Sequence, residues 1–551
     1  MLIDHLKEVN KTIIYICFLF FAIATHGKTY YFDATHGNDT NSGLAPNKAF
    51  KSLFKIKTLN LKPGDVILLH AGGIFHKPLH LENIHGTSDA PIKISTFKNS
   101  NTEAAYAYIE SFGPLNALLI KDCSYLKIDD LDISASASKN YTSISSKKAM
   151  RCGVLITTSA ESHTKSITLD NLKVHDVFFN AEGYTRPKWE VKTANGKQNY
   201  GWGIRVINKF DSSQISDVKI LNTQVYNVAH TGIKLTGNFI SNVEIAHCEV
   251  SKTGGPGMQM SRVSNVHVHH NNITNSGSKD DSRKWGRGSG LWTWGSTNVL
   301  IEYNTFMNAN GPADSAGVHI DFNCSDVIIQ YNYSANNAGG FCEILGNNYN
   351  CAYRYNISVN DGHRMKGQNG AFQQGKTLWL SGFVGKGNER NGPFNSYIYN
   401  NTIIASENII SKYAIDRASS GVLIKNNIFY IKGESQGVLG DQYKPEQAGV
   451  SRVENIVFEN NLYLKQTNWP KATIIQDDKP HFGDAGLSTV ISEELQNYIP
   501  TNKAIIKDQG DFITPIPGDS KGLHLGLLLK KDIIGNPIID KPDMGAIEIP
   551  N

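Results

Sequence analysis

A short strand pattern that recurs through the middle of the chain constrains the fold more than any other feature. The pattern alternates apolar and polar positions and is clearest at 218–222, 243–247, 266–270, 299–303, 327–331 and 351–355. Counted at the last strand residue, its steps are 25, 23, 33, 28 and 24 residues. A period in the twenties with alternating apolar residues predicts a solenoid in which each repeat forms one coil.

An asparagine follows the repeated strand in coil after coil, at Asn271, Asn304, Asn332, Asn356, Asn400, Asn427 and Asn461. Asparagine suits a sharp turn because it tolerates a left-handed backbone and its side chain hydrogen-bonds locally. In stacked coils these amides would lie one rung apart, so that each could donate a hydrogen bond to the next.

A glycine introduces a second strand in each coil, at Gly232, Gly257, Gly290, Gly317 and Gly339. The residues that follow alternate, so we expect one set of side chains to fill the solenoid and the other to line its outer face. A solenoid also needs caps at its ends. We therefore assign 28–480 to the β-helix, which includes an opening capping segment, and 481–551, where the period is lost, to a C-terminal cap of the same domain.

The first residues predict export. Lys7 and Lys11 precede an apolar run at 13–25 that small residues follow, which is typical of a signal peptide spanning 1–27. We therefore expect a secreted or periplasmic protein. The sequence has no run of about 18 apolar residues, the length that would predict a membrane span. The six cysteines beyond the predicted signal peptide are sparse for a disulfide scaffold, so we expect buried free thiols.

Charge excludes one class of partner. The chain has 54 basic and 50 acidic residues, a net charge of +4, and these residues are spread along its length. A dedicated nucleic-acid binder would gather its lysines and arginines into a stripe. A balanced chain instead suits a protein that meets an anionic polymer in one local groove, and we expect it to act as a monomer.

Three sequence blocks carry a family resemblance. The opening YYFDATHGNDTNSGLAPNKAF with LKPGDVILLHAGG, the asparagine series and the closing DMGAIE resemble secreted right-handed parallel β-helix proteins. These form the pectin-lyase-like superfamily of bacterial polysaccharide-degrading enzymes. The resemblance covers nearly the whole mature chain and implies an all-β, right-handed parallel β-helix solenoid with N- and C-terminal caps. That superfamily includes lyases, hydrolases, esterases, epimerases and phage tailspikes, so the chemistry must come from individual residues.

The candidate catalytic residues lie on neighbouring coils: Asp314, His319, Asp321 and Glu343. Four residues separate Gly317 from Asp321 and also Gly339 from Glu343, which predicts Asp321 and Glu343 on adjacent rungs, about 4.8 Å apart. This spacing is near the roughly 5–5.5 Å of a retaining glycosidase pair. We expect the two carboxylates to act as acid and as nucleophile or base, with Asp314 and His319 in support. A one-residue slip of register would turn Glu343 inward.

Candidate substrate-binding residues surround these acids. Trp292 and Trp294 occupy alternate positions of one strand and would face the same way as platforms for sugar rings. A basic group follows one coil later and would hold sulfate or carboxylate: Arg354, His363, Arg364 and Lys366. Long loops at 278–289 and 361–394 would flank the same face.

Three functions remain open. The first is a glycoside hydrolase that cleaves an anionic polysaccharide. Sulfated fucan is the first candidate substrate because the Lys/Asn/Ile-rich composition resembles exported enzymes of marine Bacteroidetes. The second is a polysaccharide lyase or uronate epimerase with Lys366, Arg364 or His363 as the base and calcium as an aid. The third is a β-helix that binds carbohydrate without cleaving it.

Metal sites are a separate question. Asp314, Asp321 and Glu343 could supply oxygen ligands for calcium, but the Asp-rich clusters of calcium-dependent lyases are missing, so we expect a hydrolase without a cofactor. Three histidines crowd one strand, at His267, His269 and His270. The first two alternate together while His270 points the other way. We interpret them as structural or groove-lining residues rather than as metal ligands.

Overall fold

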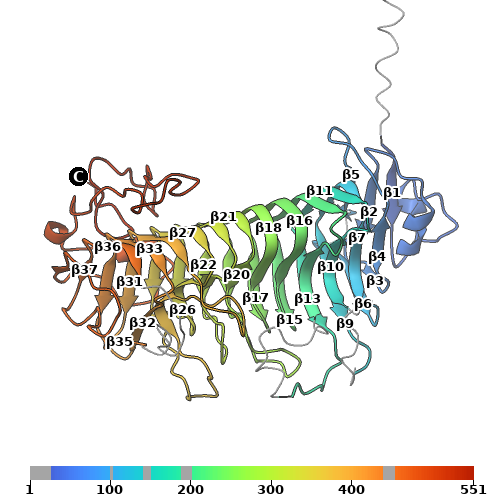
Figure 1. Ribbon diagram of the computed structural model, residues 1–551. Coiled ribbons are helices and arrows are strands. Elements are labelled where there is room, and N and C mark those ends of the chain that lie inside the picture. Colours follow the sequence, from blue (N-terminus) through green and yellow to red (C-terminus); the bar gives the residue numbers. More distant parts are fainter. Residues whose placement is uncertain (1–26, 100–102, 141–149, 188–200, 439–452, 551) are drawn as a thin grey trace, which may run out of the picture.

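The chain folds into one long stack of parallel β-coils, which runs from β1 at one end to β37 at the other in Figure 1. This computed structural model describes residues 27–99, 103–140, 150–187, 201–438 and 453–550. Apart from Gly27, the predicted signal peptide lies outside the described residues. Helical structure within the described ranges is confined to four short 3-10 helices, at Pro46–Lys48, Leu53–Thr58, Leu495–Tyr498 and Lys503–Ile505.

Each complete coil contributes one strand to each of three parallel ladders. Ladder 1 contains β4 (Leu79–Glu82), β7 (Asn116–Lys121), β10 (Arg151–Thr157), β13 (Gly201–Ile207), the first halves of β16 (Ile233–Ala246) and β18 (Met258–His269), β20 (Leu291–Trp294), β23 (Val318–Ile320), β26 (Gly340–Ile344), β29 (Lys376–Leu380), β32 (Ser411–Ile415) and β35 (Ser435–Gly437). The strands β16 and β18 continue without a break into ladder 2 and so join the two ladders.

Ladder 2 follows ladder 1 along the chain. It contains β1 (Thr29–Phe32), β2 (Val66–His70), β5 (Ile92–Phe97), β8 (Ser124–Asp129), β11 (His163–Asp170), β14 (Gln214–Leu221), the second halves of β16 and β18, β21 (Thr297–Glu302), β24 (Ser325–Gln330), β27 (Tyr349–Arg354), β30 (Phe394–Tyr399), β33 (Ser420–Lys425) and β36 (Glu454–Glu459).

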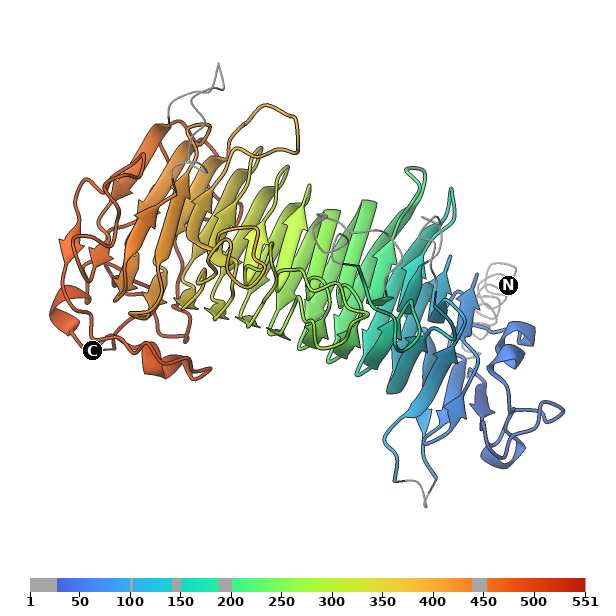
Figure 2. The ribbon, with the colours of Figure 1, turned by 90° about the horizontal axis from the view of Figure 1, so that it is seen from below.

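Ladder 3 closes each coil. It contains β3 (Ile74–Phe75), β6 (Ala107–Phe112), β9 (Leu131–Ser136), β12 (Lys173–Phe178), β15 (Gln224–Val228), β17 (Glu249–Thr253), β19 (Asn272–Thr274), β22 (Thr305–Met307), β25 (Tyr333–Ala335), β28 (Ile357–Val359), β31 (Thr402–Ala405), β34 (Ile428–Ile431), β37 (Leu462–Tyr463) and β38 (His481–Phe482). The predicted right-handed parallel β-helix is confirmed. Loops between ladders 3 and 1 lie over the middle of the solenoid in Figure 2.

The glycines that introduce the ladder 1 strands sit where the coils approach one another. A Cβ at Gly232 would lie 2.5 Å from Cγ1 of Val250, and a Cβ at Gly290 would lie 2.4 Å from the carbonyl oxygen of Gly317. No side chain fits there without moving the core or the next coil. From these glycines the strands alternate as expected: Leu291 and Val318 are buried in the core, while Trp292 and Asp321 are partly exposed.

The asparagine row lies at the turn between ladders 2 and 3. Each side-chain amide donates to Oδ1 of the next, at 2.8 Å from Asn271 to Asn304 and 2.9 Å from Asn427 to Asn461. The seven members are all buried: Asn271, Asn304, Asn332, Asn356, Asn401, Asn427 and Asn461. The interlocked amides therefore hold the same turn in seven successive coils.

Two details of the asparagine prediction are wrong. The fifth member is Asn401 rather than Asn400, because the strand before this turn ends one residue later than the pattern suggests. The left-handed backbone belongs to the residue before each ladder asparagine, for example Tyr303 with φ of 53° and Asn400 with φ of 50°. The ladder asparagines are used for their hydrogen bonds, not for their tolerance of positive φ.

The C-terminal segment packs along the side of ladder 2. The Tyr331 hydroxyl donates to the Lys531 carbonyl at 2.6 Å, and the backbone N–H of Gly545 donates to the backbone carbonyl of Asn426 at 2.8 Å. Apolar residues of the segment, among them Leu487, Ile516 and Met544, form a second core with the outward side chains of ladder 2. The C-terminal segment therefore covers the outer face of ladder 2 in the later coils, from about β24 onward, while the boundary at residue 480 stays a prediction.

The prediction that the cysteines are buried free thiols agrees with the structure. Cys123, Cys152, Cys248, Cys324, Cys342 and Cys351 are all buried free thiols. Burial raises the pKa of the Cys152 and Cys248 thiols to about 12, so both stay protonated. In the described part of the chain, no helix is long and apolar enough to cross a membrane.

Candidate active site

A row of side chains projects from the outer face of ladder 1, one from each coil. Strand pairing places Gln259 beside Trp292 and Trp292 beside His319. The row continues through Glu343 to Trp379, which pair with each other on β26 and β29. Because neighbouring strands are about 4.8 Å apart, these five side chains form a continuous strip along the solenoid.

The register of Glu343 differs from the sequence prediction by two residues. Ile320 pairs with Ile344, and Ala316 bridges to Gly340, so Glu343 lies beside His319 and not beside Asp321. A shift by an even number keeps Glu343 on the outer face. Asp321 therefore lies diagonally from Glu343, and the predicted directly opposed pair is wrong.

Asp314 is held in the loop that enters β23. The Arg287 guanidinium binds its carboxylate through Nε, at 3.0 Å from Oδ2, and through Nη2, at 2.5 Å. The side-chain amide of Gln373 fixes the same loop by accepting the Asp314 backbone N–H at 3.1 Å. Burial raises the pKa of the Asp314 carboxyl, but Arg287, His319 and Arg364 outweigh this effect and leave it below the usual value. Asp314 is thus an ionised carboxylate at neutral pH.

Asp321 has the opposite electrostatic setting. Burial raises the pKa of its carboxyl to about 7, and the negative charges of Glu343 and Asp314 act in the same direction. His319 and the backbone N–H of Phe322, which donates to Oδ1 at 2.8 Å, oppose the shift. A substantial fraction of Asp321 therefore carries a proton at neutral pH, while Asp314 does not.

His319 interacts electrostatically with both of these acids. It is only 5% exposed, its Nδ1 is 3.1 Å from Ser289 Oγ, and its ring stacks on Trp292 with centroids 5.9 Å apart and planes 8° apart. Burial lowers the pKa of His319, against the pull of Asp321 and Asp314. A neutral imidazole fits this position, where it can hydrogen-bond to an acid or a sugar hydroxyl.

The tryptophans face outward as predicted. Trp292 and Trp294 are both partly exposed, with the buried Thr293 between them. Trp294 makes an edge contact with Phe322 at 5.7 Å, and the Lys376 ammonium lies 3.8 Å from the Trp379 ring centroid. Trp292 and Trp379 flank His319 and Glu343 within the row, so these two side chains lie between two aromatic surfaces that a sugar can contact.

The predicted basic group is divided by the fold. Arg354 is fully buried on ladder 2, where Nε donates to Gln330 at 2.7 Å and Nη1 to the Tyr399 hydroxyl at 2.8 Å and the Gly526 carbonyl at 2.6 Å. Its predicted role in substrate binding is therefore wrong, because the C-terminal segment covers it.

The other three basic residues lie on the loop between β28 and β29. Arg364 is 8% exposed and donates to the carbonyls of Gln373 at 2.9 Å and Gly311 at 2.8 Å, which anchors this loop to the Asp314 loop. Burial lowers the pKa of Arg364 to about 10, far above neutrality for a base. Lys366 is exposed, and His363 is partly exposed.

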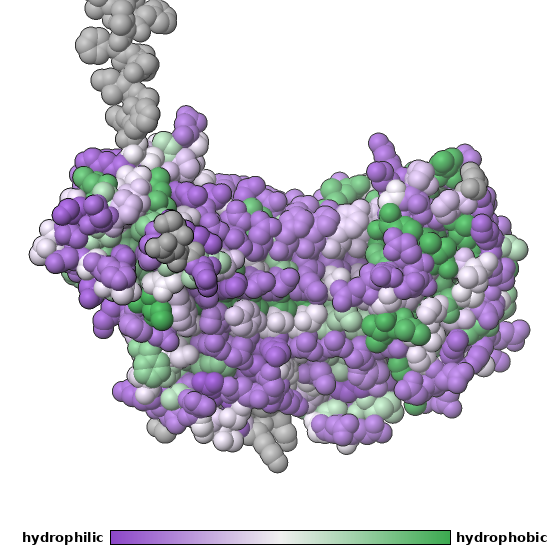
Figure 3. All heavy atoms as spheres, turned by 180° about the vertical axis from the view of Figure 1, so that it is seen from behind, coloured by the Kyte–Doolittle hydropathy of each residue, from purple (hydrophilic) through white to green (hydrophobic). Residues whose placement is uncertain are grey.

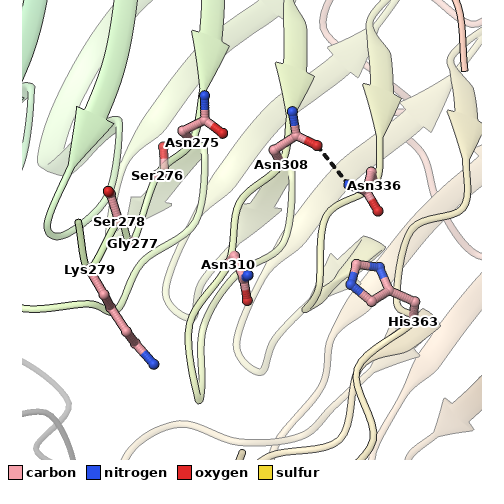
Figure 4. Close-up of a pocket in the computed structure, with 9 residues that line it drawn as sticks. All are labelled: Asn275, Ser276, Gly277, Ser278, Lys279, Asn308, Asn310, Asn336 and His363. Carbon is pink, nitrogen blue, oxygen red and sulfur yellow. Dashed lines mark hydrogen bonds between the residues drawn. The ribbon is translucent and has the colours of Figure 1, made fainter. Parts of the chain in front are cut away.

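Two hollows adjoin the Asp314 loop. One has a volume of about 390 Å³ and is lined by polar groups of successive coils, including Asn275, Asn308 and Asn336; the Asn336 amide donates to Asn308 at 2.7 Å (Figure 4). The other, of about 350 Å³, shares Lys279, Asn310 and His363 with it and reaches Gly311, Pro312 and Arg364. The catalytic candidates line neither hollow, so the hollows border the site rather than contain it.

The histidines of ladder 2 form a different group from the one in the sequence prediction. His247, His269 and His270 have ring nitrogens within 4.8 Å of one another. The His270 ring stacks between the rings of His247 and Tyr303, with both centroid distances at 5.1 Å, in the row of turn residues. His267 instead contacts Glu302 at 2.9 Å. The stacking agrees with a structural role for His270 in the turn.

The three acids proposed for calcium do not converge in the structure. Among the described residues, the histidine trio is the one group of three or more His, Cys, Asp or Glu side chains close enough to share an ion. In addition, Oδ2 of Asp314 is bound by Arg287. The expectation of a hydrolase without a cofactor stays a prediction, with calcium at these acids as the alternative, and no step of the chemistry below depends on calcium.

Sequence reasoning missed Arg287, which holds Asp314 ionised. It lies in the 278–289 insertion, next to glycines at 286 and 288, in a segment that the sequence assigns only to a loop. A single arginine in a loop gives no signal of its partner. The residues Arg205 and Lys234 were also missed, although they occupy the same position after the strand glycine as Gln259, Trp292 and His319.

Comparisons with known proteins agree with this architecture. A family model described as a right handed beta helix region matches residues 202–370, the part of the chain that carries Trp292, Asp314, Asp321 and Glu343. The fold and this strip of acids and tryptophans define a β-helix with a polar, aromatic-lined outer face.

Particular relatives are similar to this chain. It is 25% identical to a lacto-N-biosidase of Bifidobacterium longum over 95% of its own length but only 36% of the relative's, so it spans about a third of that protein. Two crystal structures of a GH136 lacto-N-biosidase from Eubacterium ramulus share its fold, at 19% and 18% identity and TM-scores of 0.53, over 83% of this chain and 68% of theirs.

Proposed function

We propose that the protein is a glycoside hydrolase whose chemistry resides on the outer face of ladder 1. The observation that supports this proposal is the outward row of Trp292, His319, Glu343 and Trp379, next to two carboxyl groups whose pKa values are shifted in opposite directions, so that Asp314 is ionised and a substantial fraction of Asp321 is protonated near neutral pH. Glycoside hydrolysis needs one carboxylic acid and one carboxylate at the scissile bond. The similarity to lacto-N-biosidases points to the same reaction class.

The roles of the two acids follow from their electrostatics. Asp321 donates its proton to the glycosidic oxygen, so that the leaving sugar departs as a neutral alcohol. The Asp314 carboxylate either attacks the anomeric carbon or removes a proton from the attacking water, and both routes add one water per bond cleaved. Arg287 keeps Asp314 ionised and oriented through its two bonds to Oδ2.

The surrounding side chains position the sugar. Trp292 and Trp379 offer aromatic surfaces on either side of the acids, and sugars bind such surfaces through their apolar faces. His319 is buried and stacked on Trp292, so its imidazole is fixed to hydrogen-bond near Asp321. Glu343, beside His319, raises the proton affinity of Asp321 and is a positioning residue in this scheme.

Two substrate classes are proposed. An anionic polysaccharide, with sulfated fucan first, follows from the composition and the export signal predicted from sequence. A glycan of the lacto-N-biose type follows from the name of the Bifidobacterium relative. We also propose that the chain acts outside the cytoplasm, secreted or periplasmic, as a monomer.

The test is mass spectrometry of products after incubation of the protein with both classes of glycan. Hydrolysis predicts oligosaccharides that carry one added water per cut, and their loss in an Asp321→Asn variant. A matched control is Asp211→Asn, an exposed acid that follows β13, four coils from Asp321, and accepts a hydrogen bond from Asn238. Unsaturated uronate ends would instead identify a lyase, and unchanged glycans that still bind would identify a non-catalytic β-helix.

A further inference from the structure

The outward row of ladder 1 continues past Gln259 into two cations. Strand pairing places Gln259 beside Lys234 and Lys234 beside Arg205. One unbroken strip of outward side chains therefore runs over five coils, in the order Arg205, Lys234, Gln259, Trp292 and His319. From Lys234 to His319 is three rungs, or about 14 Å at 4.8 Å per rung.

Arg205 is an unusual side chain for such a position. It is only 5% exposed, and its guanidinium lies 4.3 Å from the ring centroid of Trp202. Its Nε and Nη1 atoms are buried and have no hydrogen-bond partner among the described residues. Since a buried, unsatisfied charge is costly, such a group is expected to have a ligand.

Neighbouring cations add to the excess of positive charge around Arg205. Burial and then the charge of Arg205 lower the pKa of Lys234 to about 7, and the same two causes lower the pKa of Lys209. The pKa of His230 is lowered too. Burial is the largest cause, and the positive charges of Lys234, Arg186 and Arg205 add to it. No carboxylate within the described ranges forms an ion pair with Arg205 or Lys234.

The wall beside these cations is apolar. Cys152, Leu155, Trp202, Ile207 and Trp285 form a small buried cluster on the outer face. The Trp285 ring stacks on His230 at 4.8 Å. A low-dielectric wall strengthens an ion pair that forms against it. Two adjacent cations with open donors, one of them a planar guanidinium, match the geometry of a sulfate or carboxylate group.

We propose that Arg205 and Lys234 form a subsite for an anionic substituent of a glycan chain, either a sulfate ester or a carboxylate. The proposal rests on the hydrolase function above, because it takes the chain to run along the row to Asp314 and Asp321. The bound anion accepts hydrogen bonds from the Arg205 guanidinium and from the Lys234 ammonium, and its charge favours the protonated form of Lys234. Gln259 and Trp292 contact the sugars in between.

The experiment measures binding separately from turnover. The full chain with Asp321→Asn is titrated calorimetrically with three size-matched oligosaccharide sets: sulfated fucan, the same fucan after chemical desulfation, and alginate. The sulfated set tests sulfate as the anion, and the alginate set tests carboxylate. We expect one charged set to bind at least about 10-fold more tightly than the desulfated set, as a charge-assisted hydrogen bond predicts, and its affinity to fall with added salt.

Variants test the residues themselves. Lys234→Met should weaken binding of the charged set about 10-fold and leave binding of the desulfated set unchanged. Lys219→Met is the matched control: it removes one lysine from ladder 2, where it pairs with Glu244 at 2.7 Å, and should change neither. Thermal melting checks that each variant folds. If Lys234→Met does not fold, the comparison of glycan sets in the Asp321→Asn protein still tests the subsite.

The outcomes separate the subsite from the hydrolase proposal. Equal affinity for charged and desulfated sets, or a Lys234→Met protein that binds the charged set as before, would overturn the subsite while hydrolysis of a neutral glycan could stand. Charge-dependent binding that Lys234→Met abolishes, without turnover by the intact protein, would support the subsite and overturn the hydrolase.

Discussion

Two buried arginines project from different faces of the same solenoid, and their surroundings differ. Arg354 on ladder 2 makes three hydrogen bonds, one of them to the C-terminal segment at Gly526. Arg205 on ladder 1 packs on Trp202 and makes no hydrogen bond through Nε or Nη1, whereas Arg354 leaves only Nη2 without a partner among the described residues. The C-terminal segment covers the part of ladder 2 around Arg354, and no part of that segment contacts Arg205 through a hydrogen bond among the described residues.

The comparison extends beyond these two residues. On ladder 2, outward tyrosines such as Tyr331 and Tyr399 bond to carbonyls of the C-terminal segment. On ladder 1, the outward row presents acids, a histidine and tryptophans. In Figure 3 the C-terminal end of the molecule gathers hydrophobic surface, whereas the middle is mostly hydrophilic. We infer that substitutions under the C-terminal segment on ladder 2 will affect stability, and substitutions in the outward row of ladder 1 will affect function.

The largest expected effect is on catalysis at ladder 1. Asp321→Asn should lower kcat/KM about 1,000-fold, because it removes the general acid, and should leave the melting temperature close to that of the wild type. Initial-rate kinetics on the glycan identified by product analysis provide the measurement. A variant that keeps more than a tenth of the activity would remove Asp321 from the mechanism.

The next effect is on stability at ladder 2. Arg354→Met should lower the free energy of unfolding by about 3 kcal/mol, because it leaves the buried Gln330 carbonyl and the buried Tyr399 hydroxyl without a donor. Arg205→Met should instead leave stability unchanged or raise it, because it removes a buried charge with open donors. Denaturant unfolding of both variants measures the difference, and equal losses would contradict the contrast between the faces.

The pH dependence sharpens the assignment of the acid. A general acid must be protonated to act, and the pKa of Asp321 is raised to about 7. Activity should therefore fall as pH rises through about 7, roughly tenfold per pH unit beyond it. The acidic limb should lie below the usual range of an aspartate, because the pKa of Asp314 is lowered. A kcat/KM profile that stays flat to pH 9 would contradict the role of Asp321.

A smaller effect is expected from the aromatic surface. Trp292→Ala should raise KM roughly fivefold, as the loss of about 1 kcal/mol of ring contact predicts. The control is Tyr349→Ala, which removes an exposed aromatic ring from ladder 2, where it stacks on Phe394 at 4.8 Å. Similar KM changes in both variants would show that the effect is not specific to ladder 1.

The smallest expected effect comes from chelation. Treatment with EDTA should leave hydrolysis unchanged, since Asp314 is already bound by Arg287 and the proposed steps use carboxyl groups alone. Activity lost on chelation and restored by calcium would support the calcium-assisted lyase that the sequence left open.

The repeat predicted the fold well because its cause is local. Apolar alternation, the strand glycines and the turn asparagines each act within one coil or between neighbours, so a single sequence contains their signal. The fifth asparagine was misplaced only because β30 ends at Tyr399, one residue beyond the pattern's usual end.

The site was harder to predict because its geometry depends on loops of unequal length. The sequence prediction aligned Glu343 by counting from Gly339, but in the structure Gly340 is the residue that pairs with Ala316 of the neighbouring coil. Glu343 therefore lies beside His319. Arg354 was misassigned because a segment some 170 residues later covers it. Asp314 and Asp321 were identified as residue types, but their opposite protonation depends on Arg287 and on burial, which spacing does not reveal.

The asparagine row has an electrical consequence. Every amide in it points the same way, with Nδ2 toward the next coil, so the side-chain dipoles add along the solenoid axis. The positive end of this dipole series meets the carboxylate of Asp477, which accepts from Asn461 at 2.9 Å. The negative end accepts the backbone N–H of Cys248 at 2.9 Å. The series thus ends on an anion at its positive pole, as helix termini do.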